Sequence, residues 1–114
     1  MFETARWITY PSEISCCTFK KDFELEKPIK KVTAYITSMG WYLLSINGNL
    51  VNTDVFAPGY TSYTHRVQYQ EYDITKFVDN SLMVSVKAAD GWGGGKLFAL
   101  SRGKYYNYFP YSLI

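Results

Sequence analysis

Residues 41–52 read WYLLSINGNLVN and predict a β-hairpin. The Asn47-Gly48 pair suits a two-residue turn in which both residues have positive φ angles, and this dipeptide between apolar segments is the strongest short-range hairpin signal. Residues 41–46 are strongly apolar, so we expect this strand to lie in the core. Trp41 opens the strand and is expected to pack there as well.

Alternating apolar and polar residues predict further strands on both sides of this hairpin. Residues 17–25 alternate so that one face is apolar apart from Lys21, and residues 29–37 resume the alternation. After the hairpin, residues 66–74 alternate again and residues 82–88 form an apolar strand, with residues 96–101 as a further candidate. This pattern is typical of strands that have one solvent-exposed face and one buried face.

The strands are short, lie about 8–12 residues apart and are separated by turn residues, which is typical of an antiparallel sandwich or barrel. The Pro58-Gly59 pair predicts a type II turn. Because its loop contains Phe56, we expect part of this loop to be tucked inward. Residues 73–78 predict a short helical turn capped by Asp73 or Thr75. The chain has 114 residues, 47% hydrophobic and 18% aromatic. We therefore predict one all-β domain, an antiparallel β-sandwich that spans residues 1–114.

Charge and hydropathy exclude several classes of partner. Twelve Lys and Arg residues against ten Asp and Glu give a formal charge of +2, and the only basic cluster, at residues 20–31, is too thin to predict nucleic-acid binding. No apolar run approaches the roughly 18 residues that a membrane-spanning helix needs. Residues 1–7 lack the features of a signal peptide. We therefore expect a cytoplasmic protein without a nucleic-acid or membrane partner.

The two cysteines, Cys16 and Cys17, are adjacent on a predicted strand and therefore point to opposite faces. We expect two reduced thiols, because a disulfide between neighbours would be strained. With His65 as the single histidine, the chain has too few ligands for a His/Cys zinc site. A nucleophilic pair of Cys17 and His65 is a formal alternative, but no electropositive surroundings that would activate the thiol are visible.

The loops offer candidates for sugar binding, whereas phosphate loops, nucleophile elbows and paired catalytic carboxylates are not apparent. Sugar rings stack on aromatic faces while Asp and Asn side chains hydrogen-bond to hydroxyl groups. Trp92, beside Asp90 and residues 93–95 (GGG), is the best candidate for stacking, with core packing as the alternative. Asn52 and Asp54 offer oxygens for hydroxyl groups or calcium, with ordinary turn formation as the alternative.

A series of motifs occurs in order along nearly the whole chain. They are Trp7-Ile8, residues 19–25, 30–36 and 40–48, residues 57–61 (APGYT), residues 69–75, and Asp90-Gly91-Trp92. This ordered set resembles the N-terminal β-sandwich domain of bacterial alpha-L-rhamnosidases. Its Ile-Asn-Gly and Tyr-Asp-Ile-Thr segments recur in many galactose-binding-like jelly rolls, whereas the set that includes Pro-Gly-Tyr-Thr and Asp-Gly-Trp is more specific.

The resemblance implies a galactose-binding-like jelly roll that is a non-catalytic accessory domain of a larger glycoside hydrolase. In that family a separate helical barrel removes terminal L-rhamnose, so no residue of this chain is expected to be catalytic and the chain alone is expected to be inactive. The expected partners are an L-rhamnose-containing glycan and the catalytic domain. The alternative is a purely structural sandwich that docks on the catalytic barrel and binds no sugar.

The resemblance also implies binding residues, because some family members bind rhamnose with a calcium ion. Carried onto this sequence, the loop ligands fall at Asp54, Asn107 and Pro110, and the Gly-Trp motif falls at Trp92. Together with the neighbouring Asp90, the expected sugar-binding residues are Trp92, Asp90, Asp54 and Asn107. Asp54 and Pro110 are the expected calcium ligands.

Two features depart from the family pattern. Residues 93–95 are all glycine where the family usually has an aromatic residue, a basic residue and glycine, and the chain stops after residues 110–114 where the family continues with further strands. These departures predict a sandwich truncated at its C-terminus, either as a fragment of a larger enzyme or as an incomplete fold. An incomplete sandwich would have an unpaired edge, which favours self-association.

Overall fold

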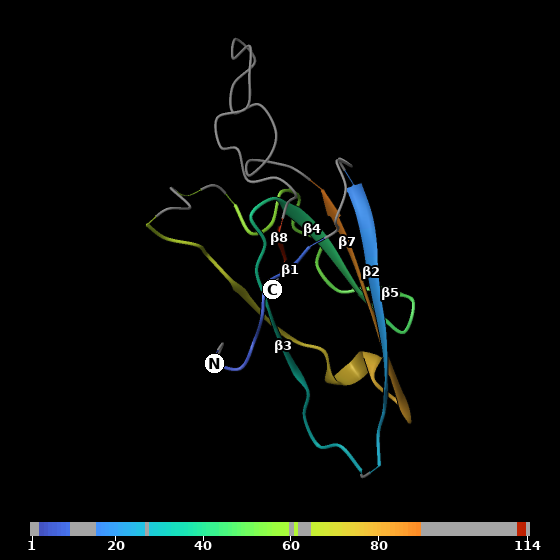
Figure 1. The fold of residues 1–114 in the computed structure, drawn as a ribbon. Coiled ribbons are helices and arrows are strands. Elements are labelled where there is room, and N and C mark those ends of the chain that lie inside the picture. The colour runs from blue at the N-terminus through green and yellow to red at the C-terminus, as the bar shows by residue number, and fades with distance from the viewer. Residues whose placement is uncertain are drawn as a thin grey trace.

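The computed structural model describes residues 3–9, 16–26, 28–59, 61, 65–89 and 112–113. These residues form eight β-strands and one 3-10 helix (Figure 1). The elements are β1 (Ile8–Thr9), β2 (Cys16–Glu24), β3 (Thr33–Ile36), β4 (Trp41–Ile46), β5 (Asn49–Leu50), β6 (Gln70–Asp73), η1 (Thr75–Phe77), β7 (Ser81–Ala89) and β8 (Ser112–Leu113). Within the described ranges, no helix has the length and apolar character needed to cross a membrane.

The strands form three antiparallel sheets, and the largest has the order β2-β7-β4-β5. Strand β7 lies between β2 and β4, so segments distant in the sequence become neighbours (Figure 1). Strands β3 and β6 form a second sheet, and β1 pairs with β8 in a third. The predicted all-β, antiparallel fold is confirmed.

The predicted hairpin is present as β4 and β5. Asn47 has φ of 49° and Gly48 has φ of 80°, the positive angles that this turn requires. The Asn47 side chain also ties the turn to neighbouring segments: its amide nitrogen donates to the carbonyl oxygens of Phe77 and Ser81 at 2.9 Å, and its oxygen accepts from the Met83 N–H at 2.8 Å. Asn47 therefore holds the hairpin against the start of β7.

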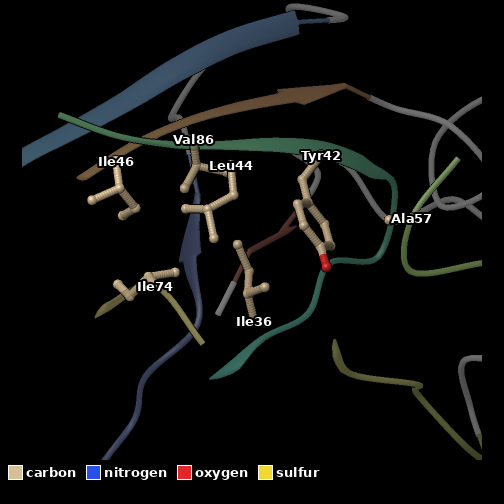
Figure 2. Packing of buried hydrophobic residues seen from close by; sticks show 7 residues of the cluster. All are labelled: Ile36, Tyr42, Leu44, Ile46, Ala57, Ile74 and Val86. Carbon is tan, nitrogen blue, oxygen red and sulfur yellow. The ribbon is translucent and has the colours of Figure 1, made fainter. Parts of the chain in front are cut away.

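The core lies between the four-stranded sheet and the β3–β6 sheet, as Figure 2 shows. Because successive side chains of a strand point to opposite faces, alternate residues of β4 enter this core. Seven buried residues form the cluster: Ile36, Tyr42, Leu44, Ile46, Ala57, Ile74 and Val86. The two layers are thus held together by apolar side chains contributed from both sheets.

The same alternation corrects one expectation. Trp41 was expected in the core, but it lies on the face of β4 opposite Tyr42 and packs against Phe56, with the ring centroids 4.5 Å apart. The loop after the hairpin is tucked partly inward, as expected, because Ala57 enters the core, whereas Phe56 itself is half exposed. Both aromatic side chains therefore lie outside the core.

The predicted strands are otherwise found with changed bounds. The segments at 17–25 and 82–88 appear as β2 and β7, whereas those at 29–37 and 66–74 are reduced to the four-residue strands β3 and β6. The candidate strand at 96–101 lies outside the described residues. Both cysteines are free thiols, as expected.

Neighbouring leucines on β4 provide a direct test of the layer assignment. Leu44 is 2% exposed and Leu43 is 42% exposed. We expect Leu44→Ala to lower the free energy of unfolding by about 2–5 kcal/mol, because it opens a cavity in the core, and Leu43→Ala to lower it by less than about 1 kcal/mol. Urea unfolding followed by circular dichroism measures both. Equal losses for the two variants would contradict the assignment of β4 faces.

Candidate functional site

The loop that follows the hairpin carries Asp54 and is anchored by the buried side chain of Asn52. Asn52 is 1% exposed, and its Oδ1 accepts a hydrogen bond from the Leu44 N–H at 2.6 Å. Its Nδ2 lies 3.4 Å from the carbonyl oxygens of Tyr42 and Asp54. A buried amide that bonds to backbone groups on both sides holds the loop firmly against β4.

The far end of this loop is a tight turn that contacts both layers of the sandwich. The Gly59 N–H donates to the Phe56 carbonyl oxygen at 2.8 Å, and the Ala57–Pro58 peptide bond is cis. The expected type II turn, with Pro58 and Gly59 at its centre, ends at residue 60, outside the described residues, so it stays a prediction. Gln70 of β6 donates to the Pro58 carbonyl oxygen at 3.2 Å. The Tyr42 N–H of β4 donates to Ala57 at 3.1 Å.

Beneath the loop, tyrosine hydroxyl groups from two sheets meet. The Tyr42 hydroxyl donates to Gln70 Oε1 at 2.7 Å and lies 3.2 Å from the Tyr72 hydroxyl. Burial raises the pKa of Tyr42 far above its usual value, and the hydrogen bond with Tyr72 adds to the effect. Burial also raises the pKa of Tyr72; the hydrogen bond with Tyr42 opposes this rise, and the nearby Asp54 carboxylate adds to it. Both phenols are therefore neutral donors at physiological pH.

A hollow of about 490 Å³ opens beside Asp54 on the outer side of the four-stranded sheet. Trp41 and Phe56 border it with their rings inclined at 54°. The remaining residues that line it are Cys16, Tyr42, Leu43, Leu50, Asn52, Thr53, Asp54, Val55, Lys87, Ala88 and Ala89. The hollow is thus largely apolar, with an exposed carboxylate-bearing residue at its margin.

Of the residues that the sequence singled out for binding, the structure describes Asn52 and Asp54. Asn52 is buried and its Oδ1 accepts from the Leu44 N–H, so it anchors the loop. Asp54 is exposed. Its side chain lies close to the Tyr72 hydroxyl. Trp92, Asp90, Asn107 and Pro110 lie outside the described residues.

Nothing in the sequence alone indicated the Trp41–Phe56 pair or the Tyr42–Tyr72–Gln70 cluster. The alternation in residues 66–74 did place Gln70 and Tyr72 on one face, but it could not show that this face meets Tyr42.

The Asp54 carboxylate is a suitable ligand for a hard cation. Calcium prefers oxygen ligands of this kind and takes six to eight of them. Within the part of the chain that the structure describes, no three His, Cys, Asp or Glu side chains gather into a metal site. Asp54 could therefore supply one calcium ligand, and Pro110, the other ligand expected from the sequence, lies outside the described ranges.

Replacing Asn52 tests the anchoring of the loop. We expect Asn52→Ala to lower the free energy of unfolding by about 1–3 kcal/mol, because it leaves the buried Leu44 N–H without its acceptor. Asn49→Ala is the matched control: Asn49 is exposed and its side-chain bonds are 3.3–3.4 Å long, so we expect a loss of about 0.5 kcal/mol or less. Urea unfolding measures both, and a neutral Asn52→Ala would refute the anchor.

The raised pKa of Tyr42 predicts a particular dependence of stability on pH. An unfolded tyrosine ionises near 10.0, whereas folded Tyr42 stays protonated above that pH, so deprotonation of the unfolded chain favours unfolding. Between about pH 10 and 11 we expect the free energy of unfolding of the wild type to fall more steeply than that of Tyr42→Phe, by up to about 1.4 kcal/mol per pH unit. Urea unfolding at several pH values measures the slopes. Parallel slopes would show that Tyr42 titrates normally.

The sequence of this chain is similar to segments of one group of enzymes. Residues 27–112 match the family described as alpha-L-rhamnosidase N-terminal domain. The alpha-L-rhamnosidase of Formosa agariphila is 37% identical over 79 residues, which are 68% of this chain and 8% of that protein. The alpha-L-rhamnosidase of Streptomyces avermitilis is 36% identical over 80 residues, again 68% of this chain and 8% of the relative.

Solved structures agree. A crystal structure of native alpha-L-rhamnosidase from Aspergillus terreus superposes with a TM-score of 0.85 and 27% identity, over 98% of this chain and 14% of that one. The crystal structure of the Streptomyces avermitilis alpha-L-rhamnosidase complexed with L-rhamnose superposes with a TM-score of 0.75 and 31% identity. This match covers 87% of this chain and 10% of that one. The region that this chain matches is therefore about a tenth of each relative.

Proposed function

The chain belongs to the alpha-L-rhamnosidase N-terminal domain family, and from this premise we propose that it is a non-catalytic accessory domain that binds terminal L-rhamnose beside Asp54, with a calcium ion. One observation carries the proposal: a loop anchored to both layers holds an exposed carboxylate next to a neutral phenol. A binding group on a fixed loop loses little conformational entropy when a ligand arrives.

The chemistry of this region suits a deoxy sugar. L-rhamnose has neighbouring hydroxyl groups and a methyl group where the parent hexose has a hydroxymethyl group. The Asp54 carboxylate can accept hydrogen bonds from hydroxyl groups. Trp41 and Phe56 offer apolar rings on which the methyl group or a ring face can pack. A calcium ion held in part by Asp54 would bind the sugar hydroxyls through their oxygens.

The surroundings of Asp54 support a role in binding rather than in catalysis. Glycoside hydrolysis uses two carboxyl groups, about 5–9.5 Å apart. Among the described residues that line the hollow, Asp54 is the only acidic one. The choice of sugar is supported by the Streptomyces avermitilis relative, whose crystal structure is a complex with L-rhamnose.

Isothermal titration of this chain with L-rhamnose, once in calcium and once in a chelator, tests the proposal. We expect a saturable heat in calcium that the chelator removes. Asp54→Ala should weaken binding about tenfold or more, because it removes a charged acceptor. Asp22→Ala is the control, since Asp22 is also an exposed aspartate but lies on β2, away from the loop. We expect no hydrolysis of an aryl rhamnoside by any variant.

Absence of heat for the wild type in both buffers would rule out sugar binding by this chain. Equal weakening of rhamnose binding by Asp54→Ala and Asp22→Ala would show that the sugar does not bind at the Asp54 loop. Hydrolysis of the aryl rhamnoside would overturn the non-catalytic role. The second candidate function is structural packing against the catalytic domain without sugar binding, and the exposed apolar outer face of the four-stranded sheet favours it.

A further inference from the structure

Strand β2 is the longest sheet edge that the described residues leave open. Its nine residues pair with β7 on one side, and no described strand pairs with the other side (Figure 1). The opposite edge of the same sheet is β5, which has only two residues. Backbone N–H and C=O groups along the free side of β2 therefore point away from the sheet, where a further strand can bind them.

The sequence of β2 lacks the features that normally protect an exposed edge. It contains neither proline nor glycine, and it pairs with β7 without interruption from Cys16 to Glu24. Lysines often protect an edge, because like charges repel a second strand. In β2, however, Lys20 and Lys21 are followed by Asp22 and Glu24, so both signs of charge lie within one short segment. A second strand with the complementary order of charges would be attracted to this edge.

The faces of the sheet limit the register in which a second copy of β2 can pair. Odd-numbered residues of β2 lie on the core side, because Phe19 pairs with Val86 of the core, and even-numbered residues lie on the outer side. Two antiparallel copies are related by a two-fold axis perpendicular to the sheet, so each residue must meet one from the same face. The axis therefore passes through a residue, and the central choices are Lys20, Lys21 and Asp22.

The register centred on Lys21 joins opposite charges on the outer side and aromatic rings on the core side. Lys20 then meets Asp22 of the second copy, and by symmetry this pair occurs twice. On the core side Phe19 meets Phe23, which is 41% exposed in the single copy. Cross-strand pairs of both kinds stabilise a sheet. An axis through Lys20 or Asp22 would instead place two like charges directly opposite each other on the outer side.

Lys21 meets Lys21 of the second copy at the axis, and its conformation reduces their repulsion. The ammonium group lies over the ring of Phe23 in the same strand, 5.0 Å from the ring centroid. Because the paired strands run in opposite directions, the two ammonium groups lean away from each other. The contact also places each positive charge against an aromatic face, which attracts a cation.

We propose that this chain forms a homodimer in which β2 pairs antiparallel with β2 of a second copy, centred on Lys21, so that two four-stranded sheets join into one. The contact uses the same surface of both copies and therefore closes at two. It is a small interface, so we expect a weak dimer whose population rises with protein concentration between about 0.01 and 1 mM. Among the described residues that line the hollow beside Asp54, none belongs to 17–25, so the inference is independent of sugar binding.

Exchange of charges across the axis tests the dimer, which sedimentation velocity measures. Lys20→Glu and Asp22→Lys should each weaken association at least about tenfold, because each variant places like charges opposite one another. An equimolar mixture of the two variants should associate again, since every outer pair then joins opposite charges. Lys30→Glu is the matched control, because Lys30 is also an exposed lysine but lies between β2 and β3. Circular dichroism confirms that each variant is folded.

Cross-linking locates the axis. With Cys16 and Cys17 both replaced by serine, a single cysteine at the axis lies opposite the same residue of the second copy. We expect Lys21→Cys to give a disulfide-linked dimer under mild oxidation. Lys20→Cys and Asp22→Cys should give much less, because in this register each is a diagonal neighbour of its counterpart, about 7–8 Å away and beyond the reach of a disulfide.

A wild type that stays monomeric over this concentration range would overturn the proposal. So would equal weakening by Lys20→Glu and Lys30→Glu, or a mixture of the two charge variants that associates no more than either alone. Cross-linking that is strongest for Lys20→Cys or Asp22→Cys would show that the register is wrong. Titration of Lys20→Glu with L-rhamnose tests the sugar proposal separately, because the dimer is weakened in that variant.

Discussion

The pairing register of β7 with β2 and β4 determines which side chains are buried and which are exposed. Nine residues of β7 pair with β2, from Ser81 opposite Glu24 to Ala89 opposite Cys16, and six pair with β4. Since side chains alternate between the two faces of a sheet, a slip of one residue would exchange every inward side chain for an outward one. The register that buries Leu44 beside Val86 therefore also exposes Leu43 beside Lys87. One strand alignment therefore determines both which side chains form the core and which lie on the outer face of the sheet.

Polar contacts close the sandwich at both ends of this apolar core. At one end, Tyr42 and Gln70 join the two layers beneath the loop that carries Asp54. At the other end, the Asn47 side chain of the hairpin turn donates to the Phe77 carbonyl oxygen of η1 at 2.9 Å. Directional bonds of this kind fix how the layers are oriented, which apolar contacts alone do not. The position of Asp54 thus follows from packing and hydrogen bonding together.

Local chemistry made much of the fold predictable from the sequence. The positive φ angles of the turn follow from Asn47 and Gly48, and the alternation in residues 17–25 reports the faces of β2. The outward position of Trp41 was not predictable in this way, because residues 41–46 are apolar on both faces and their pattern does not show which face is buried. The contact between Tyr42 and Tyr72 joins different sheets across 30 positions, so neither segment indicates it alone. For the candidate site, loop position and family resemblance indicated Asp54. The position of Tyr42 and Tyr72 beneath it could be seen only in the folded structure.

The central place of β7 has a consequence for how the chain reaches this structure. β7 is the last long strand among the described residues, yet it separates β2 from β4, and its pairing of Cys16 with Ala89 spans most of the chain. Contacts so distant in the sequence make folding slow. While the protein is being synthesised, the hairpin strand β4 exists before the strand that pairs with it. Its apolar residues then face water until residues 81–89 emerge, and the growing chain is most exposed to aggregation during that interval.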